Sequence, residues 1–357
     1  MNEKRVLEVL SKIHDPGLNQ DIVSLGFVKD LQIDGKDVSF NLEVSTPLNC
    51  HSEALYRQCD TLLGQNGFKL KKLRFQPNTR VVTYVGKDPI PRVKNTLAIA
   101  SGKGGVGKST ITVNLALALA KEGARVGVVD CDIYGPSIPL LIGLHERVIA
   151  NDKQELVPHK RFGVQWLSMG FFVPRGQAIA WRGPMLHKMV QQFLYQTEWH
   201  DLDYLLIDMP PGTGDVQLSL TEQPPLSAAL IVTTPQDVAL IDARKGLEMF
   251  GKVQVPILGI VENMSWFKCG KCEKKHSIFG DQGARKMAKE TGVPVLEELP
   301  LSSEIPSIMG SGEPLVFRDP SSPLAEPYFS LADKVARGIS ARSTKPIMQL
   351  DPNAMEV

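Results

Sequence analysis

The chain has 357 residues, of which 43% are hydrophobic and 22% are charged, values typical of a soluble globular protein with room for two domains. Its 40 Lys and Arg residues balance 39 Asp and Glu residues, so the overall charge does not support nucleic acid or an anionic membrane as a partner. The charged N-terminus lacks the apolar core of a signal peptide, and no apolar run is long enough to span a membrane.

These features predict a reducing, cytoplasmic location. The bacterial cytosol fits, and so does the plastid stroma, since a mature plastid protein would have lost its targeting peptide. In such a compartment the five cysteines are expected to be free thiols, metal ligands or redox groups, not a disulfide framework.

Residues 1–86 are predicted to form a small α+β domain. Apolar residues between Val6 and Ile13 recur at the spacing of one helical face. Residues 27–33 and 38–44 alternate like two strands paired around a turn. A second helix is expected over residues 51–63.

A larger domain is predicted over residues 96–340, after a linker at residues 87–95 that contains two prolines. In this domain apolar strand candidates alternate with helical patterns. Strands this apolar are covered on both faces, which predicts an α/β fold with a mostly parallel, doubly wound sheet. Residues 341–357 are expected to form a tail. The strand candidates are residues 96–100, 125–130, 162–167, 204–208, 228–233, 257–261 and 293–296.

A phosphate-binding loop follows the first of these strands. Residues 102–109 read Gly-Lys-Gly-Gly-Val-Gly-Lys-Ser, which fits the pattern G-x-x-x-x-G-K-[ST] between a strand and a helix and predicts a P-loop NTPase that binds ATP. Lys108 would reach the β- and γ-phosphates, and the Ser109 hydroxyl would be a magnesium ligand. The residues expected to contact the nucleotide here are Gly102, Lys103, Gly104, Gly105, Val106, Gly107, Lys108, Ser109 and Thr110.

The second lysine of this loop, Lys103, makes it resemble the deviant Walker A group of ATPases, which includes the MinD and ParA proteins. In that group the extra lysine crosses a dimer interface to the partner's nucleotide. The resemblance therefore implies a homodimer in which Lys103 acts catalytically beside Lys108. A cation delivered from a second subunit can stabilise the charge that develops on the transferring phosphoryl group.

Further polar residues stand at the C-terminal ends of predicted strands, where doubly wound sheets bind ligands. Asp208 fits a Walker B carboxylate that acts on magnesium. The resemblance assigns Asp130 and Asp132 to a switch that positions water and magnesium, with Asp132 as the catalytic residue for the water. The alternative is that one of the two only caps a turn. Asn263 lies where relatives bind adenine, and its alternative is a plain turn asparagine.

Cys269 and Cys272 form a Cys-x-x-Cys pair just after Asn263. Two thiolates at this spacing can hold one metal centre from the same side. A redox disulfide and a zinc knuckle with His276 as third ligand are both open interpretations. The pair supplies only two of the four ligands that zinc or an iron-sulfur cluster normally takes, and two copies in a dimer would supply four, which fits a bridging [4Fe-4S] cluster.

Several motifs extend the resemblance over the chain from near residue 1 to about residue 335. They are residues 102–109, 130–137, 181–184, 208–215, 233–236 and 262–265, together with Cys269 and Cys272. With these motifs the chain resembles the Mrp/ApbC family of iron-sulfur cluster carrier ATPases. The resemblance implies slow ATP hydrolysis and a labile [4Fe-4S] cluster on the two cysteines, received from cluster-assembly donors and transferred to apo iron-sulfur proteins. The alternative is a spatial-positioning ATPase of the MinD or ParA kind with a structural zinc hairpin at its dimer interface.

Residues 1–86 also resemble a small domain found alone in other iron-sulfur assembly factors, through Asp15-Pro16, Leu25-Gly26 and residues 46–50. Cys50 stands at the start of a predicted helix, where backbone N–H groups favour a thiolate. Relatives usually have proline after this cysteine, whereas this chain has His51. A helix-start residue without chemistry is the alternative. Cys59 and Cys131 are expected to be core residues.

Overall fold

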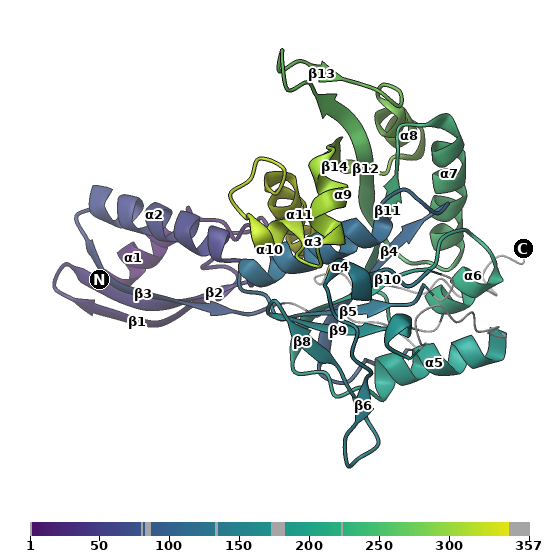
Figure 1. Cartoon of the computed structure of the whole chain (residues 1–357). Coiled ribbons are helices and arrows are strands. Elements are labelled where there is room, and N and C mark those ends of the chain that lie inside the picture. Colours follow the sequence, from purple (N-terminus) through teal and green to yellow (C-terminus); the bar gives the residue numbers. More distant parts are fainter. Residues whose placement is uncertain are drawn as a thin grey trace, which may run out of the picture. The chain divides into compact units, whose positions relative to one another are not determined.

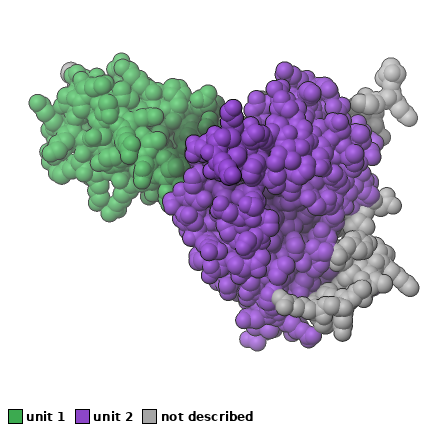
Figure 2. Space-filling model, turned by 45° about the horizontal axis from the view of Figure 1, so that its top comes forward, with its two compact units in different colours: residues 1–83, 122–124, 335–346 green, residues 84–121, 125–334, 347–357 purple. Residues whose placement is uncertain are grey.

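The computed structural model describes residues 2–79, 81–82, 87–132, 135–172, 183–222 and 224–342. The chain forms two compact units (Figure 2). The first comprises residues 1–83, 122–124 and 335–346, and the second comprises residues 84–121, 125–334 and 347–357. None of the described helices is both long and apolar enough to cross a bilayer.

The first unit contains a three-stranded sheet in the order β1-β2-β3 with helices α1 and α2 (Figure 1). β1 and β2 are antiparallel, and β3 runs parallel to β2. Every second residue of β2 is buried and packs with apolar residues of α1 and α2 in one core. The elements are α1 (Asn2–Leu10), β1 (Val28–Asp34), β2 (Asp37–Val44), α2 (Asn49–Gln65) and β3 (Lys69–Pro77).

Sequence patterning did not reveal β3. Leu70 is buried, but the next residue that faces the same way is Leu73, three positions on. Between them the register with β2 shifts, because Val38 is paired with Leu70 and Ser39 with Lys72, which leaves Lys71 as an extra residue. A bulge of this kind breaks the period of two by which a half-buried strand is recognised.

The second unit is built on a nine-stranded sheet (Figure 1). Its order is β13-β12-β11-β4-β10-β5-β9-β8, and β14 also pairs with β12. All pairs are parallel except β8 with β9 and β12 with β13, so the predicted mostly parallel sheet is confirmed. The strands are β4 (Val93–Ser101), β5 (Val126–Asp130), β8 (His159–Arg161), β9 (Val164–Ser168), β10 (Leu202–Asp208), β11 (Ala228–Thr233), β12 (Ile257–Lys268), β13 (Lys275–His276) and β14 (Val295–Leu301); β6 (Ile149–Ala150) and β7 (Leu156–Val157) pair separately.

Helices cover both faces of this sheet. Residues of α5 to α8 share one core cluster with Ala98 and Ala100 of β4, whereas α3 packs on β4, β5 and β10 and contributes nothing to that cluster. This arrangement is the predicted doubly wound fold. The helices are α3 (Lys108–Lys121), α4 (Ile138–Leu141), the 3-10 turn η1 (Met169–Phe171), α5 (Gly183–Tyr195), α6 (Asp215–Glu222), α7 (Asp237–Lys252), α8 (Gly283–Thr291), α9 (Glu304–Gly310), α10 (Leu315–Arg318) and α11 (Glu326–Arg342), whose residues from 335 on belong to the first unit.

Three elements extend beyond the residues at which the sequence pattern placed them. β4 begins at Val93, inside the predicted linker at residues 87–95, and α11 continues to Arg342, into the predicted tail. β12 extends seven residues beyond the predicted end at Val261. The apolar pattern of β12 ends at Val261, yet the residues that follow remain largely buried because β11 and β14 flank the strand. The polar side chains of these β12 residues are hydrogen-bonded, as Ser265 is to Glu262.

Strand register brings the polar strand ends together. Asp208 at the end of β10 is paired with Asp130 at the end of β5, and Thr233 of β11 with Glu262 of β12. The phosphate loop starts from β4, which lies between β10 and β11. The sequence motifs therefore meet at the carboxyl edge of one sheet.

Candidate functional site: phosphate loop and thiol hairpin

The phosphate loop joins β4 to α3 in a conformation that needs glycine. Gly105 and Gly107 have φ angles of 80° and 86°, in the left-handed region that side chains disfavour. A Cβ atom on Gly107 would lie 2.2 Å from Nδ2 of Asn263, and one on Gly102 would lie 2.2 Å from the backbone of Asp242. The loop is thus fixed both by its own backbone and by the β12 and α7 segments beside it.

A buried ion pair anchors the loop to β10. Lys108 Nζ lies 2.8 Å from Oδ1 of Asp208, and both side chains are almost completely buried. The Ser109 and Thr112 hydroxyls also donate to the Asp208 carboxylate, over 2.6 and 2.7 Å. The structure therefore brings together the predicted Walker A lysine, the predicted magnesium ligand and the predicted Walker B carboxylate. Hydroxyl and carboxylate oxygens at this spacing fit the ligand preference of Mg²⁺.

Asp130 lies close enough to the Lys108–Asp208 ion pair to interact with both charges. Its carboxylate is fully buried and accepts hydrogen bonds from the Ser168 hydroxyl at 2.8 Å and from the Asp132 backbone N–H at 3.0 Å. Burial, together with the nearby charge of Asp208, raises the pKa of Asp130 to about 7. Asp132 is partly exposed and accepts from the Gly135 N–H. Asp130 thus holds the segment that presents Asp132.

The side chains of the two lysines of the loop have different partners. Whereas Lys108 turns inward to Asp208, the partly exposed Lys103 reaches the side chain of Gln236, which precedes α7, at 3.4 Å. The Gly212 N–H donates to the Ser101 carbonyl, which brings the turn after β10 to the loop. Lys103 therefore extends toward the segment before α7 and not toward Asp208, and it has no ion-pair partner within the described part of the chain.

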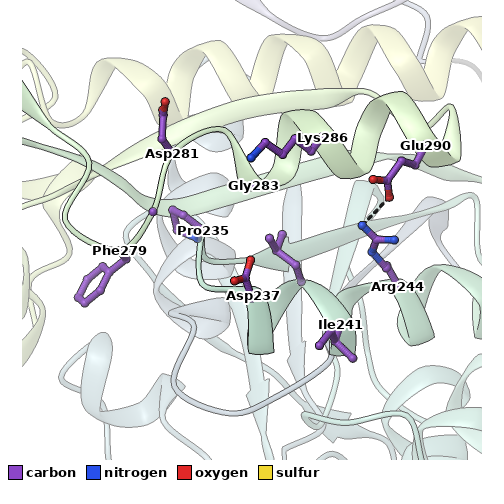
Figure 3. A pocket seen from close by; sticks show the side chains of 11 residues that line it. Pro235, Asp237, Ile241, Arg244, Phe279, Asp281, Gly283, Lys286 and Glu290 are labelled. Atoms are coloured by element: carbon purple, nitrogen blue, oxygen red, sulfur yellow. Dashed lines mark ion pairs between the residues drawn. The ribbon is translucent and has the colours of Figure 1, made fainter.

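A hollow of about 460 Å³ opens near Gln236, between α7 and α8 (Figure 3). Lys286 and Asp237 border it, and an ion pair joins Arg244 to Glu290 across one end. None of the catalytic or binding residues expected from the sequence lines it, but Pro235 belongs to the motif at residues 233–236. It is lined by Pro235, Asp237, Leu240, Ile241, Arg244, Phe279, Gly280, Asp281, Gly283, Lys286 and Glu290.

Asn263 connects the phosphate loop to β12. Its Nδ2 donates to the Val106 carbonyl at 2.8 Å, and its Oδ1 accepts from the Met264 N–H at 2.9 Å. Met264 has a φ of 55°, a left-handed conformation inside a strand. The predicted adenine contact is therefore placed against the loop, with both ends of its amide bonded to backbone.

Glu262 is an anchor that sequence reasoning did not assign. Its buried carboxylate accepts from the Ala284 N–H at 2.7 Å and from the Ser265 hydroxyl at 2.6 Å, so it fixes the start of α8 to β12. The signal was its position in a motif, between Val261 and Asn263. In the sequence, a glutamate near a hydroxyl residue at the end of an apolar run fits an exposed strand end equally well. The sequence pattern therefore could not show that Glu262 is a buried anchor.

Cys269 and Cys272 lie in the hairpin between β12 and β13, which projects beyond the sheet (Figure 1). The turn is closed by the Cys269 N–H, which donates to the Lys274 carbonyl at 3.0 Å, and by the Glu273 N–H, which donates to the Cys269 carbonyl at 2.9 Å. Cys272 is exposed and Cys269 partly exposed. The backbone N–H groups of Cys272 and Lys271, with the Cys272 thiol, lower the pKa of Cys269.

The described residues hold no group of three His, Cys, Asp or Glu side chains arranged to bind a metal ion. His276, the predicted third ligand of a zinc knuckle, is on β13, paired with Phe267. The structure therefore lends no support to that knuckle. The hairpin offers two thiols on one side, which fits half of a four-thiolate centre.

The other cysteines differ from this pair. Cys59 and Cys131 are buried, as predicted, and burial raises the pKa of both thiols, that of Cys59 to about 12. Cys50 is exposed at the second residue of α2. Within the motifs quoted above, residues 133–134 and 181–182 lie outside the described residues.

Comparison with protein families gives two matches. Residues 92–336 match the family described as NUBPL iron-transfer P-loop NTPase, and residues 3–64 match the family described as iron-sulfur cluster assembly protein.

Curated relatives match over most of their length. An iron-sulfur cluster carrier protein of Haemophilus influenzae is 42% identical over 337 residues, which cover 94% of this chain and 91% of the relative. One from Deinococcus radiodurans is 41% identical, with 97% and 98% covered. The iron-sulfur cluster transfer protein NUBPL of Mus musculus is 44% identical over 297 residues, with 83% and 92% covered.

Among solved structures, a nucleotide-binding protein in complex with ADP from Archaeoglobus fulgidus is 36% identical with a TM-score of 0.56, and the match covers 62% of this chain and 88% of that one. The cell division ATPase MinD of Pyrococcus furiosus is 24% identical with a TM-score of 0.52, over 68% and 98% of the two chains. The likeness to MinD concerns the fold alone.

Proposed function

Because this chain belongs to the family of iron-transfer P-loop NTPases that includes the iron-sulfur cluster carrier proteins, we propose that it binds and hydrolyses ATP and carries an iron-sulfur cluster to apo iron-sulfur proteins. The observation that carries the proposal is the Cys269–Cys272 pair, exposed at the tip of a hairpin whose strand also holds Asn263 against the phosphate loop. Thiolates are the usual protein ligands of these clusters.

The proposed ATP site is the phosphate loop with the ends of β5 and β10. Lys108 would bind phosphate oxygens, and the oxygens of Ser109 and Asp208 would hold Mg²⁺, which supplies charge neutralisation at the phosphates. Asp132 would orient the attacking water, while Asp130 keeps the Asp132 backbone in place. Hydrolysis then depends mainly on positioning and electrostatics, as in other phosphoryl transfers.

We further propose that the carrier is a homodimer. Lys103 is partly exposed and is not paired with Asp208, so its ammonium group could approach the nucleotide of a second copy. A two-fold dimer would also bring together two hairpins, and four thiolates match the requirement of a [4Fe-4S] cluster. The cluster is the cargo, loaded by cluster-assembly donors and released to client apoproteins.

β12 physically joins the two proposed sites. Asn263, bonded to the phosphate loop, and Cys269, the first thiol, lie on or directly after the same strand, six residues apart. Since Asn263 also bonds to Met264 N–H in its left-handed conformation, movement of the loop on nucleotide binding would act directly on this strand. We propose this connection as the route by which the nucleotide affects cluster retention.

Anaerobic reconstitution with iron and sulfide tests the carrier function. The parent chain should take up one cluster per two chains, measured by iron and sulfide analysis and by visible absorption. The Cys269→Ala/Cys272→Ala variant should take up none, and Cys50→Ala, which removes another exposed thiol, should load like the parent. A double variant that still loads normally would contradict the assignment. A zinc ion and no iron on the parent would support a structural hairpin instead.

A further inference from the structure

The thiol hairpin is rich in exposed lysines. Residues 268–276 contain four lysines and one glutamate, a formal charge of +3, whereas the whole chain carries +1. All four lysines are exposed. The positive charge is therefore local to the segment that bears Cys269 and Cys272. The lysines are Lys268, Lys271, Lys274 and Lys275.

Two of these lysines are held by the hairpin itself. Lys268 lies 3.6 Å from the Glu273 carboxylate, and the Lys275 ammonium lies 4.0 Å from the centre of the Trp266 ring. A cation over an indole face is a favourable contact. With the backbone bonds of the turn, these contacts keep the hairpin in a defined shape.

The other two lysines, Lys271 and Lys274, have no ion pair or ring contact among the described residues. Lys271 stands between the two cysteines and Lys274 two residues beyond the second. Both flank the exposed thiol of Cys272, so their charges project where a partner must approach.

We propose that Lys271 and Lys274 form a docking surface for an acidic patch on the protein that receives the cluster. This inference rests on the proposed carrier function. An acceptor must bring its own thiols to iron held by Cys269 and Cys272, which places its surface well within the Debye length of both ammonium groups, about 10 Å at moderate salt. Complementary charge at such range speeds encounter and fixes orientation.

The transfer itself is a ligand exchange without change of oxidation state. Each acceptor thiol loses a proton as its sulfur binds iron, and each carrier thiolate that leaves iron takes up one proton. Four Fe–S bonds to the carrier break and four to the acceptor form, so no oxidant or reductant is needed. The lysines take no part in bond making; they position the acceptor.

The test uses the full-length cluster-loaded protein and three synthetic acceptor peptides. Each peptide has four cysteines, flanked by about four glutamates, glutamines or lysines. At low salt the parent should transfer its cluster to the glutamate peptide about tenfold faster than to the glutamine peptide, and the difference should vanish at about 0.5 M salt. Lys271→Glu/Lys274→Glu should reverse the order and favour the lysine peptide. Lys286→Glu/Lys289→Glu, an equal charge change on α8, should keep the parent's order.

Equal transfer rates to the three peptides at low salt would overturn the inference, while cluster loading and transfer would leave the carrier function intact. Failure of the parent to load or transfer any cluster would instead contradict the carrier function. If Lys271→Glu/Lys274→Glu cannot retain its cluster, the two lysines serve to hold the cluster and not to dock an acceptor. If a short DNA duplex competes more strongly than the glutamate peptide, the two lysines bind nucleic acid. Either result overturns the docking surface.

Discussion

The phosphate loop and the thiol hairpin are both functional segments at strand ends, but they are built in opposite ways. In the loop, Lys108 and Asp208 are buried and paired with each other, and Ser109 and Thr112 complete the set. In the hairpin the thiols are exposed or partly exposed and meet no further ligand among the described residues. The loop is organised before its ligand arrives, whereas the hairpin holds half of a site.

This difference suits the two proposed tasks. A site for phosphoryl transfer benefits from fixed electrostatics, because dipoles and charges that need no rearrangement lower the barrier. A site that must release its cargo benefits from few protein ligands and an open approach. β12 supports both, since it is buried beside the loop and exposed at the hairpin. The predictions below test whether the two regions can be changed separately.

The largest effect is expected for Lys103→Gln. If the ammonium group serves the partner's nucleotide, ATP turnover should fall by roughly three orders of magnitude, the lower end of what a cation delivered in trans contributes. Nucleotide affinity and cluster loading should remain near those of the parent. Steady-state turnover and titration with a fluorescent nucleotide measure this, with Lys103→Arg as the control that keeps a cation. Unchanged turnover in Lys103→Gln would remove the proposed role.

Lys108→Ala comes next and should affect only the loop. Loss of a charged hydrogen-bond donor to phosphate should weaken ATP binding by about 100-fold. Unpairing the buried Asp208 should also lower the free energy of unfolding by about 3 kcal/mol. Cluster uptake in the absence of nucleotide should be unchanged, because the hairpin contacts neither residue.

Lys245→Ala is the matched control for this variant, since it breaks an exposed ion pair with Asp242 and should leave both nucleotide affinity and stability near the parent values. Nucleotide titration, urea unfolding and iron analysis give the three readings. Loss of the cluster in Lys108→Ala but not in Lys245→Ala, with no nucleotide present, would show that the hairpin depends on the loop even before nucleotide binds.

The smallest effect concerns the pH dependence of stability. Because the pKa of Asp130 is raised to about 7, the folded state binds more protons than the unfolded state between about pH 4 and 7. The contribution of Asp130 to the free energy of unfolding therefore decreases as pH rises through that window. Asp130→Asn should remove this decrease, seen as a flatter plot of unfolding free energy against pH.

Asp203 provides the opposite case as a control. Burial alone would raise its pKa, but hydrogen bonds from Arg125 and Lys94 outweigh burial and lower it. Its stabilising contribution is present above the unfolded pKa and is lost as pH falls, so Asp203→Asn should weaken the protein near neutral pH. For Asp130→Asn, a plot of unfolding free energy against pH that is as steep as that of the parent would contradict the raised pKa of Asp130.

Sequence reasoning recovered the sheet and the motifs at its carboxyl edge because both leave local marks: continuous apolar runs for buried parallel strands, and glycine with lysine for the phosphate loop. It missed what depends on distant contacts. A bulge breaks the alternation of buried and exposed residues in β3. The C-terminal half of β12 contains polar residues, which are buried because they are hydrogen-bonded to one another and to neighbouring segments. The pairing of Lys108 with Asp208 and the contact of Lys103 with Gln236 both join residues far apart in the chain, and no spacing in the sequence predicts them.

In the proposed carrier each chain provides half of a cluster site. Native mass spectrometry of the anaerobically reconstituted protein tests it directly, because intact masses report cargo and subunit number together. We expect one [4Fe-4S] cluster on the dimer, none on the monomer, and none on a heterodimer with Cys269→Ala/Cys272→Ala. A complete cluster on the monomer would contradict it.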